Sequence, residues 1–163
     1  MPSILFVCTA NRFRSPLAAA LLQKVLEEEC ADSNGWTIGS AGTWAEPGQP
    51  ALPAVLLAAR HLGIDLSQHR AHRVSYRMLA DHDLILVMQS SHKEALQSEF
   101  PDLSERIYLF SNVVERGSYD IPDSYRSEQE VMEIGLELDE LIRRGRDRIC
   151  VLATALFNKR QWV

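Results

Sequence analysis

The residues with the clearest chemical potential lie near the N-terminus, where Cys8 and Arg14 are separated by five residues. They stand between an apolar run at residues 4–8 and an amphipathic run that begins near Leu17. A loop of this length between a strand and a helix can turn its N–H groups inward as an anion site, next to the partial positive charge of the helix N-terminus. A thiol at the start of such a loop is favoured as its nucleophilic thiolate. Arginine offers a planar fork that holds two phosphate oxygens, so the pair predicts a site that binds and attacks a phosphoryl group.

The alternative is that Cys8 is a small buried residue at the end of a strand and that Arg14 is an ordinary surface residue of a helix. The neighbouring residues favour the chemical interpretation. Ser15 and Pro16 follow the arginine directly, and Pro16 suits the first turn of a helix, where its missing N–H costs nothing. The arrangement of strand, loop and helix is the one in which open α/β sheets bind ligands at the carboxyl ends of their strands.

The hydrophobic pattern predicts the elements that position this loop. Short apolar runs indicate strands at residues 4–8, 36–39, 83–88 and 107–110. Helical spacing and end signals indicate helices at residues 17–29, 54–62, 90–100 and 128–144, with Ser90 or Ser91 as the cap of the third. Loops are expected at residues 41–53 and 111–125. Strands that alternate with helices predict an α/β fold: a single three-layer domain with a mostly parallel sheet and helices on both faces.

Length and composition limit the possible functions. The chain has 163 residues, 46% of them hydrophobic and 24% charged, which suits one domain with a buried core. We expect that domain at residues 1–148 and a C-terminal tail segment at residues 149–163. The net charge of -5 argues against nucleic acid and anionic membranes as partners. Three cysteines are a poor disulfide framework and no apolar stretch is long enough for a membrane span, so we expect a cytoplasmic protein.

A series of short motifs in this order is similar to the low-molecular-weight protein-tyrosine phosphatases of bacterial type. The matching residues are VC at 7–8, RSP at 14–16, SAGT at 40–43, GQPA at 48–51, GIDLSQHRA at 63–71, DLILVM at 83–88 and IPD at 121–123. The similarity extends over residues 3 to about 145. Four single residues depart from the family pattern, which more often has glycine, a second cysteine, an acidic residue and proline there: Ala10, Phe13, Gln89 and Ser124. A fifth departure is that the paired tyrosines after the acid are reduced to Tyr125 and Arg126.

The resemblance implies a four-stranded parallel sheet and hydrolysis of phosphotyrosine in proteins, and of small aryl phosphates, through a phosphocysteine intermediate. It makes Cys8 the nucleophile, Arg14 the stabiliser of the phosphoryl oxygens and Asp123 the general acid. Asp120, nearby, is interpreted as a solvated turn residue. The phosphate is expected to lie against Thr9, Ala10, Asn11, Arg12, Phe13, Arg14 and Ser15. The loop is expected to be supported by Asn11, Ser15, Ser40 and His69, and the pocket to be walled by Trp44 and Tyr125.

No metal or other cofactor is implied, and the remaining histidines are interpreted as structural: His61, His72, His82 and His92. Cys30 and Cys150 are interpreted as inert. The expected partner is a phosphotyrosine-containing protein, with a bacterial tyrosine kinase as one candidate, and the expected state is a monomer.

Three alternatives to the phosphotyrosine activity stay open. An arsenate reductase shares this loop but needs relay cysteines, and residues 84–96 contain none. A protein-arginine phosphatase on the same scaffold differs in pocket selectivity, which sequence does not determine. A phosphate-binding module without turnover would need neither Cys8 nor Asp123.

Overall fold

The computed structural model describes residues 1–29 and 35–162, so the expectation for Cys30 lies outside the described residues. Its centre is a four-stranded sheet in the order β2-β1-β3-β4, and every neighbouring pair is parallel. The strands are β1 (Ser3–Cys8), β2 (Thr37–Gly42), β3 (Leu84–Val87) and β4 (Ile107–Leu109). The predicted α/β class and the parallel four-stranded sheet are therefore confirmed.

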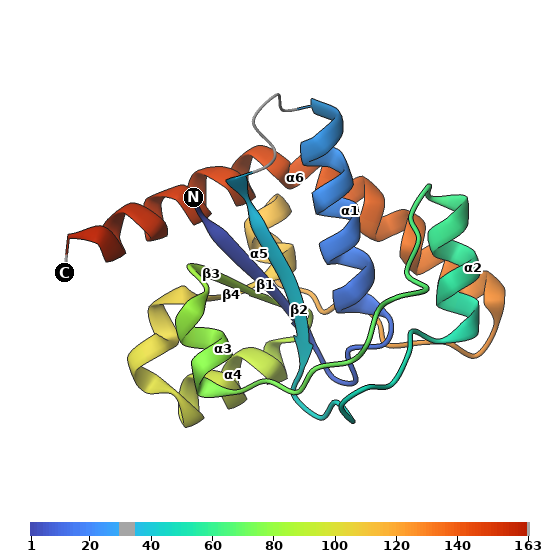
Figure 1. Cartoon of the computed structure of the whole chain (residues 1–163), viewed down its shortest axis with the longest axis horizontal. Helices are drawn as coiled ribbons and strands as arrows, with labels where there is room; N and C mark the ends of the chain where they lie inside the picture. The colour runs from blue at the N-terminus through green and yellow to red at the C-terminus, as the bar shows by residue number, and fades with distance from the viewer. Residues whose placement is uncertain (30–34, 163) are drawn as a thin grey trace.

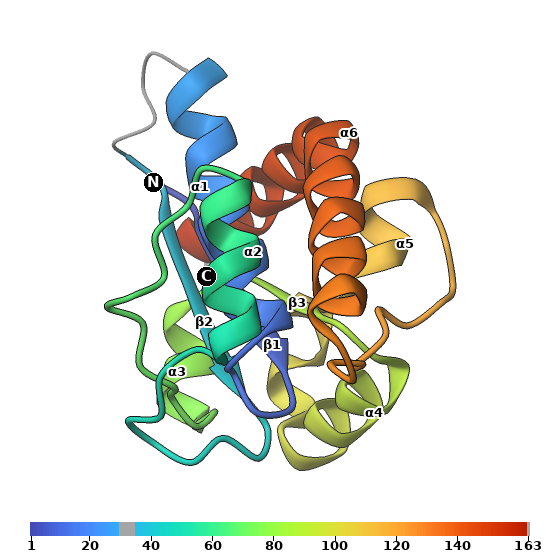
Figure 2. The ribbon, with the colours of Figure 1, turned by 90° about the vertical axis from the view of Figure 1, so that its right-hand side faces the viewer.

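Helices cover both faces of the sheet (Figures 1 and 2). On one side lie α1 (Arg14–Glu29), α2 (Pro53–His61), α5 (Phe110–Glu115) and α6 (Glu128–Gln161). On the other lie α3 (Tyr76–Asp81), α4 (Ser90–Glu99) and the 3-10 helix η2 (Pro101–Arg106). Side chains of β1 alternate between two hydrophobic clusters, Ile4 and Phe6 in the first and Leu5 and Val7 in the second. This alternation is the pleat of a strand buried on both faces.

Several predicted boundaries were wrong. The expected loop at residues 111–125 begins inside α5, and α3 and η2 were not predicted. Strand β2 continues to Gly42, two residues into the expected loop at 41–53. Ser90 is the first residue of α4 rather than its cap, because the N-cap is Gln89, which makes no side-chain capping bond.

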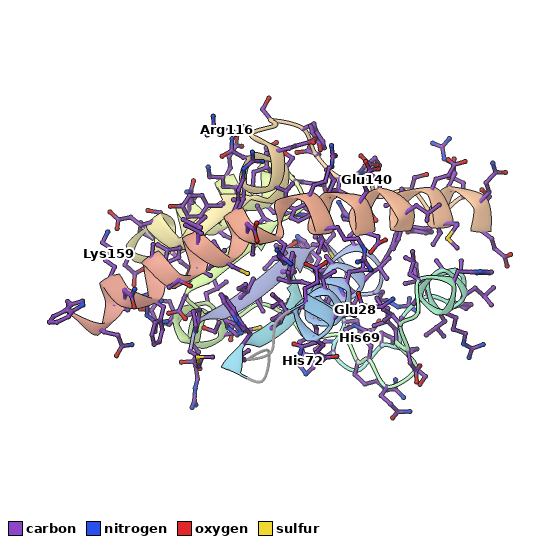
Figure 3. The ribbon with its side chains drawn as sticks, turned by 90° about the horizontal axis from the view of Figure 1, so that it is seen from above. Glu28, His69, His72, Arg116, Glu140 and Lys159 are labelled. Carbon is purple, nitrogen blue, oxygen red and sulfur yellow. The ribbon has the colours of Figure 1, made fainter. Side chains whose placement is uncertain are left out.

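The largest difference concerns α6, which runs 34 residues to Gln161 instead of ending near residue 144. The division expected at residue 148 thus falls inside a continuous helix. Ile149 and Ala153 are buried in the same cluster as the rest of α6. Near its end, Arg160 donates to the buried Asp83 carboxylate at 2.6 Å, so the last turns are fixed to the start of β3. Figure 3 shows α6 extending along the molecule to Lys159 and beyond.

The fold brings the ends of β1, β2 and β3 to one edge, where the candidate site lies. Cys8 pairs with Gly42 in the sheet register, and a Cβ on Gly42 would lie only 2.4 Å from the Thr9 carbonyl oxygen. A residue without a side chain is therefore required where β2 passes the loop that follows Cys8. Within the described part of the chain, no helix is long and apolar enough to cross a membrane.

Candidate active site

The loop at residues 8–15, called here the phosphate loop, joins the end of β1 to the start of α1. Both of its chemical residues are almost fully buried, Cys8 at 2% and Arg14 at 1% exposure. The loop is attached to the segment after β2, because Thr43 donates its N–H to the Cys8 carbonyl and Trp44 to the Thr9 carbonyl, both at 2.9 Å. The predicted nucleophile and arginine thus begin and end a backbone turn that is held from outside.

Asn11 fixes the shape of the loop from within. It is fully buried and has a φ of 57°, the left-handed region that asparagine tolerates. Its Nδ2 donates to Ser40 Oγ at 2.9 Å, and its carbonyl oxygen lies 2.7 Å from His69 Nε2. Ser40 and His69, which the resemblance implied as supports of the loop, thus both contact Asn11. A third was not predicted: the His72 N–H donates to Asn11 Oδ1 at 2.9 Å.

Ser15 connects Asn11 to the sulfur. Its Oγ accepts from Asn11 Nδ2 at 2.8 Å and lies 2.9 Å from Cys8 Sγ. Ser15 Oγ also lies 3.3 Å from the Ala41 carbonyl, so its single proton has two possible acceptors. When Cys8 is a thiolate, the charged sulfur is the stronger acceptor, and a hydrogen bond from Ser15 then stabilises the anion.

Arg14 connects the phosphate loop to the segment that holds the predicted acid. Nη1 donates to the Ile121 carbonyl at 2.9 Å, and Nη2 lies 3.2 Å from Asp123 Oδ2 and 3.4 Å from Thr9 Oγ1. Its Nε is buried and has no hydrogen-bond partner in the described residues. A buried donor without a partner is costly, so this N–H is available for an anion held by the loop.

The two carboxylates of the 120–123 segment have different partners. Asp123 is the one at Arg14, with its side chain 40% exposed. Asp120 Oδ1 instead accepts the N–H of Ser90 at 2.7 Å, so it satisfies a free donor at the first residue of α4. Asp120 is exposed and lies outside any helix or strand, as a solvated turn residue would be, but its contact with the start of α4 was not predicted. That contact leaves Asp123 as the carboxylate next to the phosphate loop.

His92, interpreted from sequence as structural only, contacts the phosphate loop directly. It lies in the first turn of α4, is 6% exposed, and places Nε2 2.9 Å from Thr9 Oγ1. Burial, with a smaller contribution from the nearby Arg14 cation, lowers the pKa of His92 to about 4, so the ring is neutral at physiological pH. The sequence held one usable signal: His92 follows β3 by a few residues, at the same sheet edge as Cys8.

The pKa of His69 is also lowered in this environment. Its burial lowers the pKa, against the opposing effect of the hydrogen bond to the Asn11 carbonyl. Since one ring nitrogen meets a carbonyl oxygen, that nitrogen must carry the proton and donate. His69 and His72 come from the segment between α2 and α3 and are labelled in Figure 3.

The remaining predicted residues differ in their placement. Phe13 is 3% exposed and belongs to the hydrophobic core. Arg12 donates from Nε to the Pro50 carbonyl at 2.8 Å. The two predicted wall residues are exposed, Trp44 at 76% and Tyr125 at 59%. Among the described residues, no group of three or more histidine, cysteine or acidic side chains could hold a metal ion.

A buried cysteine, a buried arginine and a nearby carboxylate at the carboxyl edge of a parallel sheet define a cysteine-dependent phosphatase site. The comparisons agree with this class. The family profile described as low molecular weight phosphotyrosine protein phosphatase matches residues 3–157. The chain belongs to this family.

Individual relatives resemble the chain over most of its length. A probable low molecular weight protein-tyrosine-phosphatase, EpsP, of Ralstonia nicotianae is 37% identical over 89% of this chain and 91% of its own. A protein-arginine-phosphatase of Bacillus subtilis is 28% identical over 86% of this chain and 92% of its own. The crystal structure of the tyrosine phosphatase Wzb from Escherichia coli K30, in complex with sulphate, has a TM-score of 0.78 at 29% identity, covering 90% of this chain and 97% of that one.

Proposed function

We propose that this enzyme hydrolyses phosphotyrosine in proteins, with Cys8 as nucleophile, Arg14 as the phosphate-binding residue and Asp123 as general acid. One observation carries the proposal: Arg14 lies in the loop that Cys8 begins, and its Nη2 lies 3.2 Å from Asp123 Oδ2. Nucleophile, electrostatic stabiliser and proton donor are thus joined in one site. A phosphate-binding module without turnover would need no such carboxylate.

In the first step the Cys8 thiolate attacks phosphorus in line with the tyrosine oxygen. The sulfur–phosphorus bond forms as the phosphorus–oxygen bond breaks, and Asp123 transfers its proton to the departing phenolate. Arg14 and the N–H groups of residues 9–15 donate hydrogen bonds to the three equatorial oxygens of the phosphoryl group. These fixed donors stabilise the charge on those oxygens most strongly in the transition state. The buried Arg14 Nε gains its partner from one of these oxygens.

In the second step a water attacks the phosphocysteine. Asp123, now a carboxylate, accepts the proton of that water, and the sulfur leaves as a thiolate. The hydrogen bond from Ser15 stabilises the departing sulfur, which lies 2.9 Å from its oxygen. Inorganic phosphate is released and the starting state is restored, with no cofactor consumed.

The second candidate activity is hydrolysis of phosphoarginine in proteins, supported by the Bacillus subtilis relative. We favour phosphotyrosine for two reasons. EpsP is more similar to this chain than the protein-arginine-phosphatase is. In addition, two exposed aromatic side chains lie near the site in sequence: Trp44, which is hydrogen-bonded to the phosphate loop, and Tyr125, two residues after Asp123. Aromatic walls suit an aryl phosphate, whose ring they can stack against. A monomer acting in the cytoplasm on phosphotyrosine proteins, a bacterial tyrosine kinase among them, is part of the same proposal.

The test compares three peptides of one sequence that carry phosphotyrosine, phosphoserine or phosphoarginine. We expect the highest kcat/KM for phosphotyrosine, no turnover by Cys8→Ser, and loss of most of kcat in Arg14→Lys. Lysine keeps the charge but loses the bidentate geometry, so it is the matched control for charge alone. A higher kcat/KM for the phosphoarginine peptide would refute the phosphotyrosine activity and support the protein-arginine phosphatase instead. Turnover by Cys8→Ser within tenfold of wild type would exclude the covalent mechanism.

A further inference from the structure

Arg73 stands out among the surface cations because an aromatic ring holds it in place. Its guanidinium carbon lies 5.5 Å from the centre of the Trp44 ring. None of the ion pairs within the described residues involves Arg73, so no carboxylate in that part of the chain forms an ion pair with its N–H groups. A guanidinium over a ring face keeps its N–H edge outward and has lost side-chain freedom in advance. Arg73 is therefore a prepared donor fork.

The sheet register relates the backbone of Arg73 to that of the nucleophile. Cys8 pairs with Gly42 in the sheet, and Gly42 forms a parallel bridge with Arg73. Two successive strand spacings, about 10 Å, therefore separate the Arg73 backbone from the Cys8 backbone. An extended peptide advances about 3.4 Å per residue, so this offset corresponds to about three residues of a bound substrate.

A cavity of about 350 Å³ begins at the same wall and continues toward α4. Trp44 and Arg73 line one side, and Leu96, Glu99 and Phe100 line the α4 side. Trp44 also donates its N–H to the Thr9 carbonyl, so one lining residue of the cavity is attached to the phosphate loop. Glu99 repels an acidic group from the α4 side, whereas Arg73 attracts it to the Trp44 side.

We propose that Arg73, held on Trp44, binds the carboxylate of an Asp or Glu within about three residues of the phosphotyrosine, so that the enzyme selects acidic phosphopeptides. The inference rests on the proposed function and names the substrate class for that site. Arginine suits this role because its two parallel N–H donors match the two oxygens of a carboxylate. The net charge of the chain is -5, so an acidic substrate depends on such a local cation.

The experiment uses two phosphotyrosine peptides that differ only in flanking residues, Glu in one and Gln in the other. For wild type we expect kcat/KM to be about fivefold higher for the Glu peptide, as fits a partly exposed bidentate ion pair. Arg73→Gln should abolish the preference, and Arg73→Lys should retain only part of it. Hydrolysis of p-nitrophenyl phosphate, which has no flanking residues, should be the same in all three proteins.

Arg77→Gln is the matched control for net charge. Arg77 lies on α3, four residues after Arg73 in the sequence. Its side chain is 93% exposed, and its Nε lies 3.8 Å from Asp81 Oδ2. This variant should keep the wild-type preference. Equal rates for the two peptides in wild type, or an unchanged preference in Arg73→Gln, would overturn the inference. If only phosphoarginine is hydrolysed, the proposed function fails, and the same Glu and Gln pair built around phosphoarginine then decides the inference separately.

Discussion

Replacement of Asn11 tests the idea that one buried side chain holds the phosphate loop in shape. Asn11→Ala removes three side-chain hydrogen bonds, two donated by Nδ2 to Ser15 and Ser40 and one accepted from the His72 N–H. At about 1 kcal/mol each, these account for about 3 kcal/mol. Alanine at a φ of 57° adds about 1 kcal/mol of backbone strain.

The expected loss is therefore about 4 kcal/mol, a large part of the 5–15 kcal/mol that stabilises a typical domain. The assay is urea unfolding at equilibrium, and the same loss should lower Tm by about 10 °C in a chain of this size. Asn11→Gly separates the two contributions, because glycine removes the hydrogen bonds but adopts the left-handed conformation freely. We expect Asn11→Gly to be more stable than Asn11→Ala by about 1 kcal/mol.

Activity provides the second measurement on the same variants. Without Asn11 the N–H groups of the loop lose their common direction, so vanadate binding should weaken in both variants even where they remain folded. The reasoning is refuted if Asn11→Ala unfolds within 1 kcal/mol of wild type. It is also refuted if glycine is no better than alanine, since the strain at this position would then be absent.

Two further predictions concern protons. Asp123→Asn should slow phenyl phosphate hydrolysis by about 10²–10⁴-fold and affect an aryl phosphate with an acidic phenol much less, because a general acid matters most for a basic leaving group. Asp120→Asn is its control and should lack this dependence on the leaving group; the reverse result would exchange the two assignments. The pKa of His92 is about 4 against 6.5 in the unfolded chain, so the unfolded state binds the extra proton first and stability falls as pH drops from about 6.5 towards 4. The free energy of unfolding is measured at pH 7 and pH 4 for wild type and for His92→Gln. Between these two pH values wild type should lose about 3 kcal/mol more than the variant, and equal losses would contradict the prediction.

The sequence predicted those elements whose apolar pattern ends at a polar stretch. Strand β1 and helix α1 are separated in this way by the polar residues of the phosphate loop. Helix α5 could not be predicted in this way, because the apolar run of β4 continues into it with Phe110 as the first helical residue. Periodicity alone does not show where a strand gives way to a helix when no turn residue separates them. The residue that ends α5 in the left-handed conformation is Arg116, and the glycine follows it at position 117.

Helix α6 contains a residue that looks like a helix end but is required for packing. Gly145, close behind two arginines, resembles a helix end, yet the helix continues for another 16 residues to Gln161. A Cβ on Gly145 would lie 2.5 Å from Val114 Cβ, so glycine is needed there for the contact between α5 and α6. The constraint comes from tertiary packing, which the sequence around Gly145 does not display.

Some residues of the candidate site could be related from the sequence, and others only from the fold. Cys8, Arg14 and Asn11 lie within one loop, so their spacing alone relates them. Asp120 and Asp123 are three residues apart and chemically identical, and only their distant partners distinguish them: the Ser90 N–H for one and Arg14 for the other. The resemblance assigns the acid to Asp123, and that assignment remains a prediction. The fold adds that Asp120 accepts the N–H of Ser90 at the start of α4, whereas Asp123 is the carboxylate beside Arg14.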